Sequence, residues 1–353
     1  MIYFVAFIAT FCLAVLFVPF VKQFAFRVGA VDQPLKNSRK IHKTVMARGG
    51  GIAIYLAFLI TTLALLPQRN AQYWGLIVAG TIVLLVGFID DIKSLNPWLK
   101  LAVQIMAAFI AFGMFGIRIE AVSSPLGQSI IFTDPNLVFT ILNHTISLNT
   151  FALALTTIWL VGMTNTMNFV DGIDGLSGGI AAIAAVVMFF LALNPQVHQS
   201  QTALISIALA GGSLGYLVYN FNPAKIFNGD SGAYFLGMSL GIIAIFSGGK
   251  LATAALVLGV PILDALWSAL RRIISGRSPF SADRGHLHFL LLDAGFSQRQ
   301  AALIIYSFCI IFGGIALIAS PTQKIVAIFS LAIIIMLLFV LLSFVIRRKR
   351  KIS

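Results

Sequence analysis

The chain has 353 residues, of which 59% are hydrophobic and only 10% are charged. A soluble domain carries about 25% charged residues, so this composition excludes a water-soluble protein and indicates an integral membrane protein. The formal net charge is +13, but membrane proteins acquire such an excess from basic cytoplasmic loops, so it does not indicate nucleic-acid binding. The two cysteines, Cys12 and Cys309, lie far apart in apolar runs, which excludes a disulfide framework and a thiolate metal site.

The apolar runs predict the fold class. With about 20 apolar residues per membrane-spanning helix, we expect an all-α polytopic membrane protein with about 11 transmembrane helices, and one integral membrane domain over residues 1–353. The expected spans are 2–26, 49–67, 73–90, 98–116, 151–168, 176–193, 201–220, 231–248, 252–272, 299–319 and 324–346.

The basic residues predict the orientation of these helices. The basic tail 347–353 places the C-terminus in the cytoplasm by the positive-inside rule, and an odd number of spans then places the N-terminus outside. The segment 273–298 becomes a cytoplasmic loop that contains histidines. On this topology the outer side holds only Arg69, Arg118, Lys250 and Lys324.

Two shorter elements are expected between the spans. The long outer segment 117–150 alternates apolar and polar residues around a turn at Pro125–Gly127, which predicts a small β-hairpin on the outer face. On the inner side, Leu290–Asp293 is expected to form a short helix ended by Gly295. The residues Ser297–Gln300 have the capping-box pattern that begins a helix.

The acidic residues gather on the predicted inner side. Only Glu120 and Asp134 fall outside, whereas the other nine lie in inner loops or at inner helix ends. Several form close groups: Asp90–Asp91 ends a helix, Asp171 and Asp174 are three residues apart, and Asp230 lies in a glycine-rich turn. Neighbouring carboxylates repel unless a cation lies between them. We therefore expect Mg²⁺ or Mn²⁺, which bind carboxylates together with substrate phosphates.

Helix capping is the alternative explanation for these acids. Asp230 could cap a helix that begins near Ser231, and Asp174 could cap one that begins near Leu176. Capping does not explain Asp90–Asp91, because the helix macrodipole disfavours acids at a helix C-terminus.

Basic and glycine-rich segments lie on the same side as the acids. Residues 36–51 place Arg39, Lys40, His42, Lys43 and Arg48 just before three glycines that open a helix. This arrangement favours the binding of phosphate. A basic loop beside a membrane also serves as a topology signal or as a contact for anionic lipid. Bases for phosphates and acids for a cation, at a membrane surface, indicate a phosphorylated cytosolic substrate and a lipid as the second substrate.

The same stretches resemble a known family. They are Arg39–His42 with Arg48–Gly50, Gly87–Asp91, Asn165–Leu176, Phe227–Gly232, Pro261–Asp264 and Asp283–His288. In this order they resemble the polyprenyl-phosphate N-acetylhexosamine-1-phosphate transferase superfamily. Within it the chain is most similar to the bacterial undecaprenyl-phosphate GlcNAc-1-phosphate transferases, which initiate synthesis of enterobacterial common antigen, the O-antigen of lipopolysaccharide, or wall teichoic acid.

The resemblance implies an enzyme with a defined reaction. It would transfer N-acetylglucosamine-1-phosphate, or a related 2-acetamido-sugar-1-phosphate, from a UDP-sugar to undecaprenyl phosphate and release UMP. The resemblance also implies Mg²⁺ or Mn²⁺, the bacterial cell membrane as location, and an active site on the cytoplasmic face. Membrane lipid surrounds such a protein, nucleic acid is not a partner, and a homodimer is compatible with the pattern.

The resemblance also implies roles for individual residues. Asp230 would be a metal ligand, with Asp91 beside it on metal or phosphate, and Asp90 would be the base that keeps the lipid phosphate ionised. The pattern does not separate the roles of Asp90 and Asp91. The nucleotide pocket would be lined by Asn168, Asp171, Asp174, Asn220 and Phe227, of which the two aspartates also count as catalytic. Arg284, His286 and His288 would contact the diphosphate and sugar, and Lys40, His42 and Lys43 would contact phosphates.

One departure and two alternatives remain. Phe289 stands where the family usually has a third histidine, which leaves His286 and His288 as the intact pair. An ion-coupled transporter also uses acids in membrane helices, but it places them near the midplane and often in inverted repeats. Here only Asp264 lies inside a span, after Gly259–Pro261, and the chain shows no internal repeat. An inactive scaffold is disfavoured because every acidic motif is intact.

Overall fold

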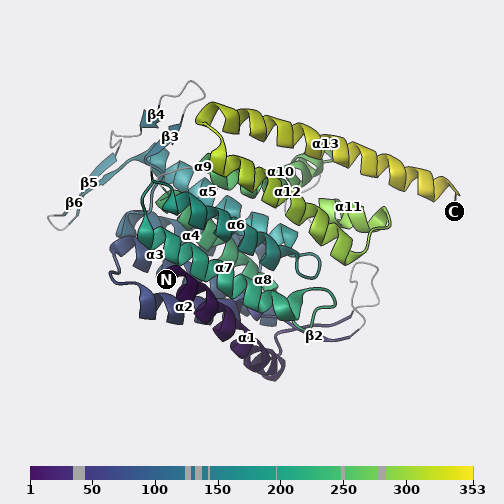
Figure 1. Cartoon of the computed structure of the whole chain (residues 1–353), viewed down its shortest axis with the longest axis horizontal. Coiled ribbons are helices and arrows are strands. Elements are labelled where there is room, and N and C mark those ends of the chain that lie inside the picture. Colours follow the sequence, from purple (N-terminus) through teal and green to yellow (C-terminus); the bar gives the residue numbers. More distant parts are fainter. Residues whose placement is uncertain are drawn as a thin grey trace.

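The computed structural model describes residues 1–34, 44–123, 129–131, 137–141, 144–195, 197–247, 251–276 and 284–352. These residues form a bundle of long helices that lie side by side, with short β-ribbons at the two ends of the bundle (Figure 1). The helices are α1 (Ile2–Val28), α2 (Gly50–Leu65), α3 (Ala71–Ile92), α4 (Pro97–Phe115), α5 (Thr150–Val170), α6 (Leu176–Leu193), α7 (Ser200–Asn220), α8 (Gly229–Phe246), α9 (Leu251–Val257), α10 (Gly259–Ile274), α11 (Leu287–Asp293), α12 (Gln298–Ile318) and α13 (Pro321–Ile352).

The predicted fold class is confirmed: the protein is an all-α polytopic membrane protein. Within the described residues, nine helices are long and apolar enough to cross a membrane. They are α1, α3 to α8, α12 and α13. The expected spans 49–67 and 252–272 correspond to the shorter apolar helix α2 and to the pair α9 and α10.

The expected span 252–272 is present as a broken pair of helices and not as one straight helix. The helices α9 and α10 meet at Leu258 and are bent by 79°. Pro261 has no backbone N–H, and its ring clashes with the carbonyl four residues earlier, so the chain cannot continue as one straight helix. The helix α10 therefore leaves the direction of its neighbours and carries Asp264 toward the histidine segment.

The described residues of segment 117–150, which was expected on the outer side, form two antiparallel hairpins where one was expected. The first pairs β3 (Ala121–Ser123) with β4 (Ser129–Ile131), and the second pairs β5 (Leu137–Ile141) with β6 (His144–Leu148). In the second hairpin β6 alternates polar and apolar residues over Thr145–Leu148, whereas β5 is almost entirely apolar, and the single-hairpin prediction used neither strand. A third ribbon, β1 (Val31–Asp32) with β2 (Met46–Ala47), pairs Val31 with Ala47 and was not expected.

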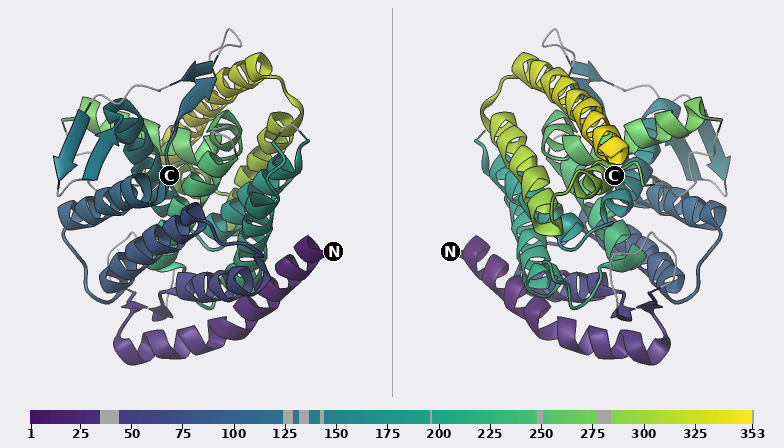
Figure 2. Two further views of the ribbon diagram at one scale, coloured as in Figure 1. Left: turned by 90° about the vertical axis from the view of Figure 1, so that its left-hand side faces the viewer. Right: turned by 90° about the vertical axis from the view of Figure 1, so that its right-hand side faces the viewer.

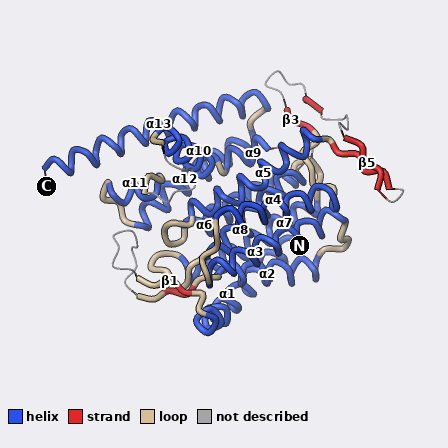
Figure 3. The backbone as a smooth tube through the Cα atoms, turned by 180° about the vertical axis from the view of Figure 1, so that it is seen from behind, coloured by secondary structure: helices blue, strands red, loops and turns tan. Residues whose placement is uncertain are grey.

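The ribbons mark the two ends of the bundle. The hairpins β3 to β6 lie at one end, whereas β1 and β2, α11 and the C-terminus lie at the other (Figures 1 and 3). Segments that were predicted to share a side of the membrane therefore lie at the same end of the bundle. Which of the two ends faces the cytoplasm stays a prediction. At the end that carries β1 and β2, α11 and the capping box at Ser297 and Gln300 confirm the two local predictions made for this segment.

The helix α8 lies at the centre of the bundle. It packs against α2, α3 and α5, and every residue of it except Asp230 is buried. The helix α1 runs along one edge, and α13 covers the opposite one (Figure 2). Glycines permit close packing: a Cβ on Gly211 or Gly215 of α7 would lie 2.4 Å from a carbonyl oxygen of α1. The result is a tightly packed frame around the one accessible side chain of α8.

Candidate functional site

A cavity of about 520 Å³ opens at the end of the bundle that carries β1 and β2. Its walls come from four segments far apart in the sequence, all of which end or begin a helix or strand. These are Asp32 with Thr44, Met46 and Arg48; Asn168 with Asp171–Asp174; Asn220 with Pro223, Ala224 and Phe227–Asp230; and Gln298. The cavity therefore brings together residues of three of the six motifs from the sequence, those that contain Arg48, Asp171 and Asp230.

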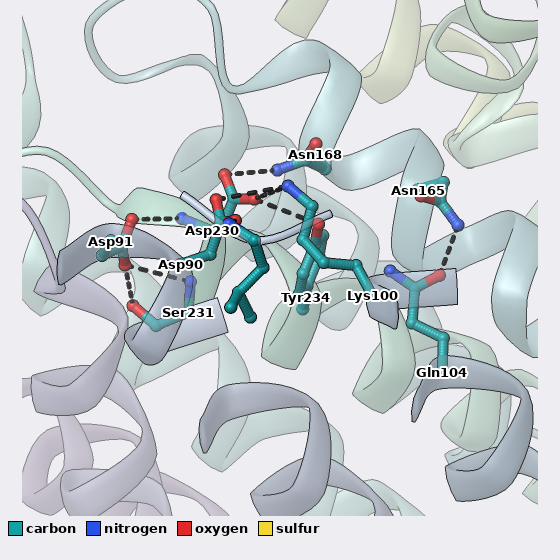
Figure 4. Close-up of polar contacts among 10 residues, drawn as sticks. Asp90, Asp91, Lys100, Gln104, Asn165, Asn168, Asp230, Ser231 and Tyr234 are labelled. Carbon is teal, nitrogen blue, oxygen red and sulfur yellow. Dashed lines mark hydrogen bonds and ion pairs between the residues drawn. The ribbon is translucent and has the colours of Figure 1, made fainter. Parts of the chain in front are cut away.

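Asp230 lies at the wall of this cavity in a cluster of charged groups (Figure 4). Its carboxylate accepts hydrogen bonds from Asn168 Nδ2 at 3.0 Å, from Lys100 Nζ at 3.1 Å and from the Tyr234 hydroxyl at 3.0 Å. Lys100 Nζ also lies 3.2 Å from Asp90 Oδ2. The lysine ammonium thus joins two carboxylates that come from the end of α3 and the start of α8.

The adjacent Asp91 points in a different direction. Its carboxylate accepts hydrogen bonds from the backbone N–H of Asp230 at 2.9 Å, the backbone N–H of Ser231 at 3.2 Å and the Ser231 hydroxyl at 2.8 Å. The two acids at the end of α3 are therefore stabilised by separate partners, Lys100 for Asp90 and the first turn of α8 for Asp91. This explains how both tolerate a helix C-terminus.

The loop between α5 and α6 supplies Asp171 and Asp174. Burial is the main reason that the pKa of Asp171 is raised to about 8; the hydrogen bond from Ser177 lowers the pKa, and the nearby charges of Asp230 and Asp91 raise it. Asp174 Oδ2 accepts hydrogen bonds from Asn222 Nδ2 at 2.8 Å and from the backbone N–H of Ala224 at 3.0 Å.

Neither Asp174 nor Asp230 acts as the cap that was considered for it. The helix α6 has Gly175 as its N-cap, and α8 has Asn228. Neither N-cap makes a side-chain capping hydrogen bond. The capping explanation therefore fails for both aspartates.

Asn220 connects the two loops that line the cavity. Its Oδ1 accepts a hydrogen bond from the backbone N–H of Gly175 at 2.9 Å, and its Nδ2 donates to the carbonyl of Ile226 at 2.9 Å. The backbone of Phe227 pairs with Ala47 and Gly50, which ties this wall to β2 and α2. At the same wall, Arg48 donates to Asp32 at 2.7 Å, so the β1–β2 ribbon contributes an ion pair to the cavity.

The histidines are held beside the cavity and, among the described residues, do not line it. His286 is buried, with Nδ1 2.9 Å from Asp264 Oδ2 and Nε2 3.3 Å from the Arg272 guanidinium. The other oxygen of Asp264 accepts from the backbone N–H of Leu287 at 2.8 Å.

His288 is also buried and lies against the α5–α6 loop. A Cβ on Gly172 would lie 2.2 Å from His288 Nε2. Burial lowers the pKa of His288 to about 4, so its ring is neutral at pH 7. Arg284, the third residue predicted here, makes an ion pair with the part-exposed Asp293 at 3.1 Å.

Comparisons with known proteins place the chain in a family. Residues 73–248 match the sequence profile of glycosyl transferase family 4. The chain is 31% identical over 340 residues to a Bacillus subtilis (strain 168) protein named probable undecaprenyl-phosphate N-acetylglucosaminyl 1-phosphate transferase, covering 94% of this chain and 88% of that protein. The chain belongs to glycosyl transferase family 4.

Two further relatives extend the likeness over nearly the whole chain. A decaprenyl-phosphate N-acetylglucosaminephosphotransferase of Mycolicibacterium smegmatis is 32% identical, covering 91% of this chain and 84% of its own length. An undecaprenyl-phosphate alpha-N-acetylglucosaminyl 1-phosphate transferase of Salmonella typhi is 27% identical, covering 98% and 91%. This member of family 4 is therefore a transferase, as the resemblance implied, and the transporter alternative is not supported.

The structure of this family 4 transferase adds site residues that the sequence reasoning did not select. Lys100 and Gln104 lie four residues apart on α4, where Lys100 contacts Asp230 and Gln104 contacts Asn165 at 2.6 Å. Two polar side chains at helical spacing inside an otherwise apolar span are a signal that would have identified them. Lys40, His42 and Lys43, to which phosphate contacts were assigned, lie outside the described residues.

Proposed function

We propose that the protein transfers N-acetylglucosamine-1-phosphate from UDP-N-acetylglucosamine to undecaprenyl phosphate and releases UMP. The observation that carries this proposal is the Asp90–Lys100–Asp230 cluster beside the 520 Å³ cavity, at an end of the membrane helices where a soluble nucleotide and a lipid headgroup can meet. The printed names of the relatives, which act on undecaprenyl or decaprenyl phosphate, agree with it.

Mg²⁺ or Mn²⁺ is the proposed cofactor, and the residues present fit such an ion. The Lys100 ammonium lies 3.2 Å from Asp90 and 3.1 Å from Asp230, so this position already suits positive charge. The described residues contain no group of three His, Cys, Asp or Glu side chains that could hold a metal. Asp230 would therefore hold the ion together with substrate phosphates, as is usual for Mg²⁺. A bound ion would neutralise charge on the diphosphate.

The proposed chemistry is a single in-line displacement. An oxygen of the lipid phosphate forms a bond to the β-phosphorus of the UDP-sugar, while the bond from that phosphorus to the bridging oxygen breaks, and the oxygen leaves with UMP. Asp90 accepts any proton left on the lipid phosphate, and Lys100 stabilises the charge on the transferred group. Positioning and charge neutralisation suffice, so no covalent enzyme intermediate is needed.

The remaining residues hold the nucleotide and shape the cavity. The proposed nucleotide contacts line the cavity beside Asp230; they are Asn168, Asp171, Asp174, Asn220 and Phe227.

We assign the site to the cytoplasmic face of the bacterial cell membrane. In support of this side, the basic C-terminal tail lies at the same end of the bundle as β1 and β2 (Figure 1).

A direct assay tests the proposal. Protein purified in detergent is mixed with undecaprenyl phosphate and a panel of UDP-sugars, and the release of UMP and the formation of the lipid-linked sugar are measured. UDP-N-acetylglucosamine should be the preferred donor, and Asp230→Asn should abolish turnover while the protein still inserts in the membrane. Glu120→Gln, in an exposed ion pair near the opposite hairpins, is the matched control and should retain full activity. Full activity of Asp230→Asn, or a trapped phosphoaspartate, would refute the mechanism.

A further inference from the structure

The two adjacent carboxylates at the end of α3 have different surroundings. Asp90 faces Lys100 and, through it, Asp230. Asp91 is 3% exposed, is absent from the cavity lining, and faces the start of α8 (Figure 4). The pair therefore does not form one joint ligand set in this structure.

The contacts of Asp91 use both of its oxygens. Oδ1 accepts from the backbone N–H of Asp230, and Oδ2 accepts from the backbone N–H and the hydroxyl of Ser231. The first N–H groups of a helix have no partner within the helix, and the helix dipole favours a negative charge beside them. Asp91 thus supplies from a neighbouring helix the stabilisation that a capping side chain would supply from within α8.

The backbone around these contacts is so closely packed that two glycines have no room for a side chain. Gly229 has a φ of +77°, and a Cβ there would lie 2.3 Å from an oxygen of Asp91. Gly87 lies one turn before Asp91 on α3, and a Cβ on it would lie 2.5 Å from the backbone nitrogen of Ser231. The last turns of α3 and the first turn of α8 are therefore in backbone contact, with the Asp91 carboxylate between them.

We propose that Asp91 is a positioning residue that anchors the first turn of α8 and so directs the Asp230 carboxylate toward the cavity, and that it is not itself a metal or phosphate ligand. Asp230 carries one of the N–H groups that Asp91 holds, so the direction of its side chain depends on that hydrogen bond. The inference separates the two acids that the sequence left equivalent. It rests on the proposed function only for the role of Asp230.

A double-mutant cycle tests the contact without any substrate. The variants are Asp91→Asn, Ser231→Ala and their combination, with Glu120→Gln as the control, and the measurement is the thermal unfolding midpoint in detergent. Because the two side chains act through one contact, the loss in the double variant should be smaller than the sum of the single losses. Additive losses would overturn the inference whatever reaction the protein catalyses.

Kinetics then test the consequence for the site. Asp91→Asn should lower kcat by about 10-fold or more, the usual scale for a hydrogen bond to a charged group, with KM for the UDP-sugar changed by less than about threefold. Ser231→Ala should lower kcat in the same way but less, and the combination should be no worse than Asp91→Asn alone. Ser231→Ala removes one of three hydrogen bonds, so it keeps the test decisive if Asp91→Asn does not fold. An unchanged kcat in Ser231→Ala would overturn the inference.

A ligand exchange separates positioning from metal binding. Cysteine favours soft metals such as Cd²⁺, so Cd²⁺ should bind and restore activity to Asp230→Cys but not to Asp91→Cys. Binding is measured by the ultraviolet absorbance of the cadmium–thiolate bond, which requires no turnover. A cadmium–thiolate signal in Asp91→Cys would show that Asp91 is a ligand and overturn the proposal. Absence of turnover in the unchanged protein would instead refute the proposed function and leave the double-mutant cycle as the test of the contact.

Discussion

Replacing Lys100 with methionine removes the ammonium that joins Asp90 and Asp230 and keeps the length of the side chain. The nitrogen lies 3.2 Å from one carboxylate and 3.1 Å from the other, with 20% of the lysine side chain exposed. At an effective dielectric constant of 20, each attraction is about 5 kcal/mol before desolvation. Desolvation cancels most of this, and a pair between the fully exposed and fully buried limits has a net contribution of about 2 kcal/mol. Lys100→Met should therefore lower the unfolding midpoint by a few degrees.

The effect on turnover should be larger than the effect on stability. A preorganised positive group beside a transferred phosphoryl group typically contributes about 100-fold to kcat, so Lys100→Met should lose about that factor in UMP release. The matched control is Lys93→Met, an exposed lysine in the connection that leads from α3 to α4, which should keep its activity. If Lys100→Met retained more than a third of the kcat, or if Lys93→Met lost as much, the assigned role of the lysine would be wrong.

Three further predictions follow from the site. Gly172→Ala would place a Cβ 2.2 Å from His288 Nε2 and should destabilise the protein by about 1–3 kcal/mol, whereas Gly162→Ala, with open space around it, should not; equal unfolding midpoints would contradict this. His288 has a pKa of about 4 in the folded protein and about 6.5 in the unfolded chain, so the unfolded chain binds more protons between these two pH values. The free energy of unfolding should therefore fall by about 2 kcal/mol from pH 7 to pH 5. If His288→Gln showed the same dependence of stability on pH, this cause would be rejected. Removing divalent cations with EDTA should stop turnover and Mg²⁺ or Mn²⁺ should restore it; sustained activity would exclude the proposed cofactor.

Hydropathy and charge predicted the helices well because the membrane imposes both. A span must be apolar over its full length, and this requirement located α3 and α8 within a few residues. The break before Pro261 was less visible, because the composition of a bent pair is the same as that of one straight span. The sequence contained the cause of the bend but not its angle of 79°.

The site was predicted in part, for a different physical reason. Sequence motifs identified Asp171, Asp174 and Asp230, which the structure brings to one cavity. Lys100 was missed because its helical spacing to Gln104 was not used, and a lysine near a helix end is also what snorkelling at a membrane surface produces. The separate directions of Asp90 and Asp91 could not be predicted, since they depend on which side of α3 meets α8. Contacts between distant segments of this kind are set by packing and leave no local pattern.

The burial of α8 has a consequence for inhibitor resistance. Its glycines touch neighbouring backbones: a Cβ on Gly237 would lie 2.5 Å from a carbonyl oxygen of α5, and one on Gly232 would lie 2.7 Å from Gly51. Substitutions along this helix therefore disturb the frame of the protein, and a substitution of Asp230 removes the proposed metal ligand. A compound that takes its affinity from the start of α8 should thus select few viable escape mutations there, and resistance should arise instead at the cavity walls formed by β1 and β2.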